Sequence, residues 1–288
     1  MYNTGTLKHK PVIELKNLNF FYRRQPDLFD SLDLQLTPGL NYGLLGCNGA
    51  GKTSLLHLLS GLLFPKSGQI AVMGFEPRRR QQPFLADLFF LSEDHHIPKV
   101  RIGRLLRMYA PFYPKFDRDY FEELLHHFGL EIDQHLSKLS FGEQKKAMIA
   151  FGLATRCRLL LLDEPTNGLD IPSKKQFREQ LAGATGPDQI CILSTHQVRE
   201  LEGMIDSVII IDQGKIVLEE TKEAIEEKLA LQFCFQEPIV GEVLYYEQVP
   251  GGYHCLQLKS EDAASKKIDF ELLFNAVIER PEEMRALF

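Results

Sequence analysis

The chain has no tryptophan, few cysteines and no long apolar run. Its five cysteines are scattered among 288 residues without the spacing of a metal site, and an odd number fits free thiols in a reducing compartment better than a disulfide framework. No stretch approaches the roughly 18 consecutive apolar residues of a membrane-spanning helix. Met1 also opens no basic and apolar leader. We therefore expect a chain of the cytoplasm that does not cross a bilayer by itself.

An excess of basic residues is missing as well. There are 33 Lys and Arg against 39 Asp and Glu, a net charge of −6, whereas nucleic-acid binders usually show a basic face. The three arginines from Arg78 to Arg80 are accordingly interpreted as a solvated loop, and no direct nucleic-acid partner is expected. Hydrophobic residues make up 44% of the chain, enough to bury one sizeable core beside a small second domain.

The pattern of apolar residues predicts an α/β organisation. Residues 12–22 and 31–39 alternate apolar and polar positions, which indicates a hairpin of half-buried strands. Helical periodicity dominates residues 92–140, and three β-rich apolar segments follow between residues 158 and 220. Beyond about Lys222 the pattern changes to a few strands and a terminal helix.

The first chemical motif is GCNGAGKT, from Gly46 to Thr53, which fits G-x-x-x-x-G-K-[ST] completely. Its glycines let backbone N–H groups turn inward around phosphate oxygens, and the helix that follows presents its positive end to the same anion. Lys52 is expected to reach the β- and γ-phosphates and the Thr53 hydroxyl to hold Mg²⁺. A plain glycine-rich turn is the weaker alternative.

The second motif is LLLLDEP, from Leu159 to Pro165. A buried strand carries Asp163 to its carboxyl end, where ligands sit in doubly wound sheets. Asp163 is expected to hold the Mg²⁺ shell, which leaves Glu164 free to deprotonate an attacking water. Read alone, Asp-Glu-Pro could equally be a strand-ending turn, but the phosphate loop before it favours the catalytic interpretation.

Five motifs in order resemble the ATP-binding cassette superfamily over about residues 10–222. They are the phosphate loop, LSFGEQ, LLLLDEP, NGLD at 167–170 and STH at 194–196. The resemblance implies a RecA-like P-loop core with an antiparallel β-subdomain and an inserted helical subdomain. It assigns residues 1–222 to the cassette, about 93–145 to the helical subdomain and 223–288 to a small C-terminal α+β accessory region.

The resemblance also implies nucleotide hydrolysis between two cassettes that face head to tail. Ser140 and the amide of Gly142 would bind the γ-phosphate held by the opposite protomer. Tyr22 is similar to the aromatic residue that stacks on adenine, although it also fits a hairpin core. Asp170 matches the aspartate that tightens the contact between protomers, and His196 the histidine that contacts the γ-phosphate.

Three positions depart from the family pattern. Phe141 places bulk where a glycine is usual in the signature loop. Glu93 stands where a glutamine usually senses Mg²⁺ and couples to the membrane subunit; its carboxylate can still approach the ion directly or through water. Cys47 lies inside the phosphate loop, where a thiol has no evident task and is interpreted as a small tolerated residue.

Motifs and resemblance together give the candidate site. Catalytic roles are expected of Glu164, His196 and Lys52, and Mg²⁺ ligation of Thr53, Asp163 and Glu93. The expected ATP-binding positions are Tyr22, Gly46, Cys47, Asn48, Gly49, Ala50, Gly51, Lys52, Thr53, Ser54, Ser140, Gly142 and Asp170.

Two classes of function stay open at this point. The first is an ATPase subunit, peripheral on the inner face of the membrane, that drives a separate membrane permease of the exporter type and docks through residues 92–115. The second is a soluble cassette ATPase that acts in cluster assembly or on a nucleic-acid or ribosomal partner. Both halves of the composite site occur in one chain, so a homodimer is feasible, and pairing with a different cassette stays open.

Overall fold

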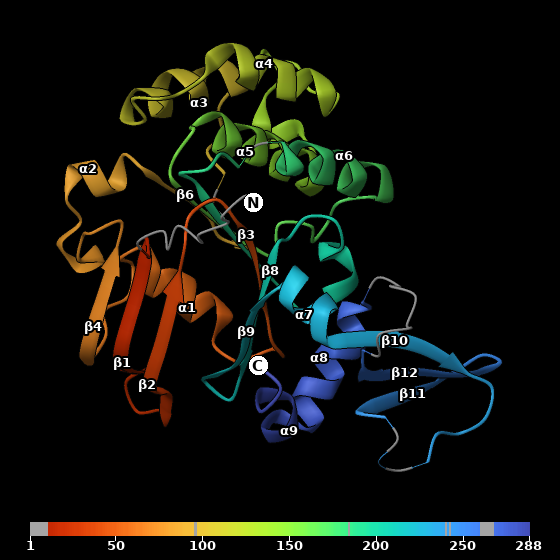
Figure 1. Ribbon diagram of the computed structural model, residues 1–288. Coiled ribbons are helices and arrows are strands. Elements are labelled where there is room, and N and C mark those ends of the chain that lie inside the picture. The colour runs from red at the N-terminus through yellow and green to blue at the C-terminus, as the bar shows by residue number, and fades with distance from the viewer. Residues whose placement is uncertain (1–10, 95–96, 184, 240, 242, 260–267) are drawn as a thin grey trace, which may run out of the picture.

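A six-stranded sheet forms the centre of the molecule (Figure 1). The computed structural model describes residues 11–94, 97–183, 185–239, 241, 243–259 and 268–288, so residues 1–10 of the expected cassette lie outside it. The strand order is β5-β6-β7-β3-β8-β9, and only β9 runs antiparallel to its neighbour. These strands are β3 (Asn41–Leu45), β5 (Leu88–Leu91), β6 (Leu159–Asp163), β7 (Ile190–Thr195), β8 (Ser207–Asp212) and β9 (Lys215–Thr221).

The strands that carry the motifs are buried along their whole length and are mostly apolar, because other elements cover both faces of the sheet. Every residue of β3, β6 and β7 is buried, as expected for parallel strands covered on both faces. The helices that connect the sheet within this part of the chain are α1 (Lys52–Leu59), α2 (Gln82–Leu85), α6 (Ile171–Ala182) and α7 (Lys222–Lys228), with single turns at η1 (Pro77–Arg79) and η4 (Val198–Leu201).

The antiparallel β-subdomain is a three-stranded sheet in the order β2-β1-β4, comprising β1 (Ile13–Phe21), β2 (Asp27–Leu36) and β4 (Ser67–Val72). The expected hairpin is present, but β2 begins at Asp27 rather than at residue 31. Ser31 takes a left-handed φ of 53° and the register shifts nearby. This bulge interrupts the alternation, so the sequence pattern hid the first part of the strand, where Phe29 pairs with Phe20.

A helical layer covers one end of the central sheet (Figure 1). Aromatic rings join its helices, since Phe151 of α5 lies 5.9 Å from Phe121 of α4 and 4.9 Å from Phe116 between ring centroids. The layer begins within the region expected to be helical, residues 92–140, and extends past it through α5 to Ala154. Its elements are α3 (Ile102–Tyr109), η2 (Ala110–Phe112), α4 (Arg118–His127), η3 (Leu136–Lys138) and α5 (Phe141–Ala154).

The last part of the chain forms a small α+β unit beside β8 and β9 (Figure 1). Helix α8 packs against η4 and β8, and an Arg199–Glu271 ion pair joins η4 to α8. The α/β class with its β-subdomain and helical layer is thus confirmed, whereas the exact division at residue 222 stays a prediction. The unit contains β10 (Leu229–Cys234), β11 (Tyr245–Val249), β12 (Gly252–Leu258), α8 (Phe270–Glu279) and α9 (Pro281–Arg285).

Candidate active site

The loops that follow β3, β6 and β7 meet at one edge of the central sheet because these three strands are neighbours and run in parallel. The loops after β3 and β6 line a cavity of about 430 Å³, which brings together several of the expected site residues. Phosphate-loop residues, Glu93 and Glu164 share its walls with Tyr22. The cavity is lined by Tyr22, Gln25, Pro26, Asp27, Leu28, Asn48, Gly49, Gly51, Lys52, Thr53, Ser54, Glu93 and Glu164.

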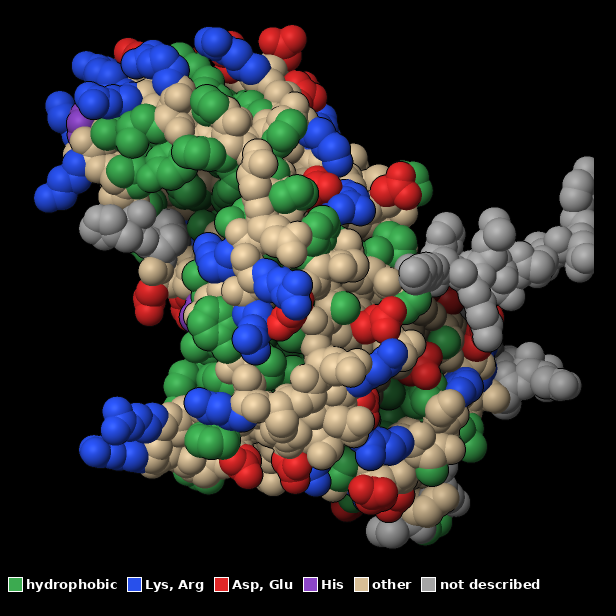
Figure 2. Space-filling model, turned by 90° about the vertical axis from the view of Figure 1, so that its left-hand side faces the viewer, with side chains coloured by type: hydrophobic (Ala, Val, Ile, Leu, Met, Phe, Trp, Pro, Cys, Tyr) green, Lys and Arg blue, Asp and Glu red, His purple; other side chains and the backbone are tan. Residues whose placement is uncertain are grey.

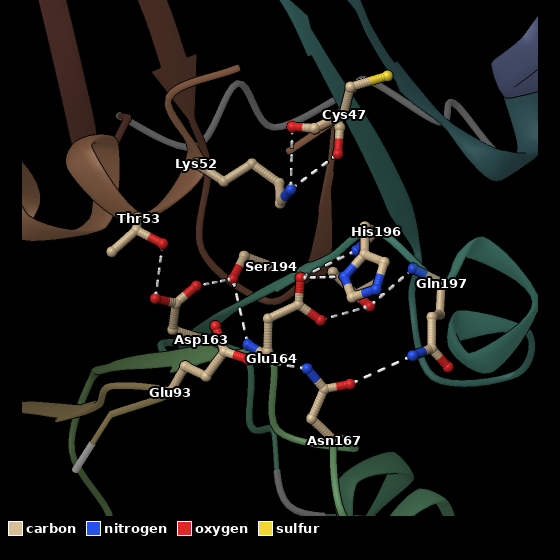
Figure 3. Close-up of polar contacts among 12 residues, drawn as sticks. Cys47, Lys52, Thr53, Glu93, Asp163, Glu164, Asn167, Ser194, His196 and Gln197 are labelled. Carbon is tan, nitrogen blue, oxygen red and sulfur yellow. Dashed lines mark hydrogen bonds and ion pairs between the residues drawn. The ribbon is translucent and has the colours of Figure 1, made fainter. Parts of the chain in front are cut away.

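The phosphate loop is closed over its own lysine. The Lys52 ammonium is buried and donates to the carbonyls of Gly46 at 2.7 Å and Cys47 at 3.3 Å. Burial lowers the pKa of Lys52, while the carboxylates of Glu164 and Asp163 work in the opposite direction. The Cys47 thiol points away from this ammonium (Figure 3), so in this form only the backbone of Cys47 contacts it.

Oxygen ligands suited to Mg²⁺ lie together at the start of α1 and the end of β6. The Thr53 hydroxyl donates to Asp163 Oδ2 at 2.8 Å, and Ser194 donates to the other carboxylate oxygen. The described residues contain no group of three or more His, Cys, Asp or Glu that could hold an ion by themselves. One hydroxyl and one carboxylate fit Mg²⁺, which usually keeps waters and substrate phosphates as its remaining ligands.

Glu164 and His196 form the centre of the expected chemistry. Glu164 Oε1 accepts from the His196 backbone N–H at 3.0 Å and lies 2.7 Å from His196 Nδ1, and Oε2 accepts from the Thr195 hydroxyl at 3.0 Å (Figure 3). The Glu164 side chain is only 6% exposed. Its backbone has a φ of 46°, a left-handed conformation that a non-glycine residue adopts only where its surroundings hold it.

A polar chain connects three loops of the site. Asn167 donates to Glu93 Oε1 at 2.9 Å, and Gln197 donates to the Asn167 side chain at 3.3 Å (Figure 3). Sequence reasoning gave no role to Asn167 or Gln197. Their positions were the available signal, because Asn167 is the first residue of the NGLD motif and Gln197 follows the STH motif, each after a neighbouring strand.

The signature loop lies outside the walls of this cavity. Ser140 caps α5 in a reciprocal capping box: its hydroxyl accepts from the Glu143 backbone N–H at 3.3 Å, while the Glu143 carboxylate accepts from the Ser140 backbone at 2.8 Å. Phe141 fits in place of glycine because it faces Gly168, where a Cβ atom would lie 2.7 Å from the ring. Asp170 caps α6 through the Ser173 N–H at 2.9 Å.

Tyr22 stands at the rim of the cavity rather than in the core. It is 37% exposed, and its hydroxyl forms a 2.9 Å hydrogen bond with the Ser54 hydroxyl. Its ring meets Phe20 edge to face at 5.0 Å. Stacking of adenine on the Tyr22 ring stays a prediction.

Comparison with known proteins identifies the family. The family model for ABC transporters matches residues 29–167. A putative ABC transporter ATP-binding protein, TTE0246 of Caldanaerobacter subterraneus subsp. tengcongensis, is 32% identical over 77% of this chain and 97% of its own length. The chain belongs to the ABC transporter ATP-binding protein family. This ABC protein is also 30% identical to Nod factor export ATP-binding protein I of Neorhizobium galegae, over 72% of the chain and only 61% of that relative.

A solved structure supports the fold of this ABC protein. The structure of an ATP-binding subunit of an ABC transporter superposes with a TM-score of 0.65, covers 74% of this chain and 92% of its own, and is 24% identical. The RecA-like P-loop core expected from the sequence is thereby confirmed. Among the described residues of this ABC protein, no helix combines the length and the apolar character needed to span a membrane.

Proposed function

We propose that the chain hydrolyses ATP as one half of a dimer and powers a separate membrane permease. One observation carries the dimer: phosphate-loop residues and Glu164 line one cavity and Asp163 contacts Thr53 of that loop, while Ser140 and Gly142 lie outside the cavity walls. A nucleotide held by Lys52 would therefore meet a signature loop only if a second cassette supplied it. A second copy of this chain can do so, because both halves of the site are present in it, and a different cassette could take the same place.

The chemistry follows from the positions of the charged groups. Lys52 would leave the carbonyls of its own loop and bind the β- and γ-phosphates, and Thr53 and Asp163 would hold Mg²⁺, which neutralises charge on the phosphates when bound. Glu164 would accept the proton of the attacking water. His196, 2.7 Å from Glu164, would keep that carboxylate oriented and contact the γ-phosphate.

An exposed apolar face supports the permease partner. Around a cavity of about 630 Å³ between α2, β5 and η2 lie Leu62, Tyr109 and Phe112, which are 50%, 41% and 68% exposed. Arg104 and Arg107 of α3 form no ion pair within the described part of the chain. Hydrophobic and basic side chains gather on this part of the surface in Figure 2. Such a face fits a protein partner, and the relative named for Nod factor export favours an exporter.

A charge placed on this face tests the permease. We expect Phe112→Glu to weaken copurification with a coexpressed integral membrane permease by about tenfold or more, because a central apolar contact becomes a buried carboxylate. Phe235→Glu is the matched control, since Phe235 is 84% exposed on the C-terminal unit. Equal copurification of both variants, or no association of the parent, would contradict the proposal.

Two neighbouring variants separate the phosphate and metal contacts. Lys52→Ala removes the ammonium, so affinity for ATP should fall by about tenfold or more with or without Mg²⁺. Thr53→Ala removes only a hydroxyl beside Asp163 and should weaken binding chiefly when Mg²⁺ is present. Titration of a fluorescent ATP analogue with Mg²⁺ and with a chelator measures both. If both variants bound MgATP with the affinity of the parent, the assignment of this loop as the phosphate-binding loop would be wrong.

A further inference from the structure

Lys145 is a fully buried lysine that the site described above does not use. It lies one turn into α5, is 0% exposed, and donates to the backbone carbonyls of Glu164 at 2.8 Å and Asn167 at 2.9 Å. Its ammonium also lies 5.2 Å from the centre of the Phe141 ring, which covers it from outside. No ion pair of Lys145 occurs among the described residues.

Burying an ammonium on carbonyl oxygens is expensive, so this arrangement needs a reason. Burial lowers the pKa of Lys145, and the carboxylates of Glu93, Glu164 and Asp163 offset part of that effect. Its half-buried neighbour Lys146 donates instead to the Phe128 carbonyl in the helical layer, at 3.2 Å. Of these two adjacent lysines, only Lys145 contacts the Glu164 and Asn167 carbonyls.

The two carbonyls belong to the loop that carries the proposed base. The Glu164 carbonyl also accepts from the Asn167 backbone N–H at 3.2 Å, so the ammonium closes a turn from Glu164 to Asn167. That turn begins with the left-handed φ of 46° at Glu164 and ends at the residue that holds Glu93. Without the two hydrogen bonds, both carbonyls would lose buried donors and the turn could relax toward an ordinary conformation.

We propose that Lys145 is a positioning residue whose ammonium clamps the Glu164–Asn167 turn onto the signature helix and so fixes the direction of the Glu164 carboxylate. This inference rests on the proposed function, in which Glu164 activates water. Because α5 also carries Ser140, the clamp ties the base of the chain's own site to the loop that serves its partner's site. Movement of α5 on meeting the partner's nucleotide would thus reorient Glu164.

Four variants test the clamp by steady-state ATPase kinetics and by ATP affinity. Lys145→Met shortens the side chain by one atom and removes the donors, so kcat should fall by about tenfold or more with ATP affinity unchanged, since small misplacements of catalytic groups cost this much. Lys145→Gln keeps an N–H₂ donor for two carbonyls and should stay within about threefold of the parent. Lys146→Met is the matched control, expected within about twofold. Glu164→Gln reports on the base itself.

The outcomes distinguish a failure of the clamp from a failure of the proposed function. Turnover of Lys145→Met near the parent while Glu164→Gln is inactive would overturn the clamp and leave the proposed function intact. Active Glu164→Gln would instead remove the base assignment on which the inference rests. Equal losses in the Met and Gln variants would also overturn it, because then the donors are not what matters. If the Met variant does not fold, Lys145→Gln decides alone: near-parental turnover supports the clamp and a tenfold loss overturns it.

Discussion

Glu164→Gln should bind ATP like the parent and hydrolyse it about 10²-fold or more slowly, the usual scale for losing a general base. The amide has the shape of the carboxylate, so Oε1 can still accept from the His196 backbone N–H while the other end meets the Thr195 hydroxyl. The shape is kept, while the negative charge and the capacity to take a proton are removed. Because the nucleotide then stays intact, an ATP-bound dimer should persist in gel filtration.

Glu202 offers a matched control for this variant. It is exposed just beyond η4, so Glu202→Gln makes the same chemical change outside the cavity and should leave turnover within about twofold of the parent. Near-normal turnover in Glu164→Gln would move the base elsewhere. His196, whose Nδ1 lies 2.7 Å from Glu164, is the next candidate.

Mixing two inactive variants should restore part of the ATPase activity. Ser140→Arg leaves the phosphate loop intact but blocks the signature loop. Lys52→Ala impairs the phosphate loop and leaves the signature loop intact. Each variant alone should therefore be nearly inactive. In a mixed dimer, one composite site receives both sound halves. Equal mixing gives whole sites at about a quarter of the parental number for a symmetric pair. ATPase rate and ATP-induced dimer formation should be followed together.

The cap made by Ser140 requires a control of its own. Losing it costs about 1 kcal/mol of helix stability, which by itself should not abolish turnover. Ser140→Ala measures that loss without bulk, and Ser137→Arg places the same large cation on an exposed position three residues earlier. If Ser140→Arg alone, still dependent on Glu164, hydrolysed ATP at the parental rate, the loop would be only a helix cap and no site between protomers would exist.

The sequence predicted the core of the fold because its strands are buried on both faces and its phosphate loop has one dominant geometry. Continuous apolar runs marked β6 and β7, and the glycine spacing marked the start of α1. The alternation of apolar and polar residues failed to predict a strand where local backbone geometry interrupts that alternation. At Ser31 a bulge hid the start of β2. The third strand of that sheet, β4, was missed because its first three residues are exposed and only its last three are buried or half-buried.

The sequence predicted which motif residues would lie together, but not the contacts that side chains make with backbone carbonyls. Lys52, Thr53 and Glu164 line the expected cavity, and Asp163 lies behind it in contact with Thr53. Lys145 stood in the signature stretch without a role, since nothing in a sequence says which carbonyl a lysine meets. The sequence likewise could not explain why Phe141 is accepted in place of the usual glycine, because the explanation is Gly168, which the fold places opposite its ring.

The capping box of α5 means that this helix end already holds an anion before any nucleotide arrives. Hydrogen bonds from the Ser140 backbone and hydroxyl hold the pKa of Glu143 below its usual value, so its carboxylate stays charged. In the proposed dimer the partner's γ-phosphate must compete with this internal substitute, at a cost of about 1 kcal/mol for a displaced cap. A partner cassette without ATP brings no γ-phosphate to this helix end. The Glu143 carboxylate then stays bound to Ser140, and the contact adds no free energy to dimer formation.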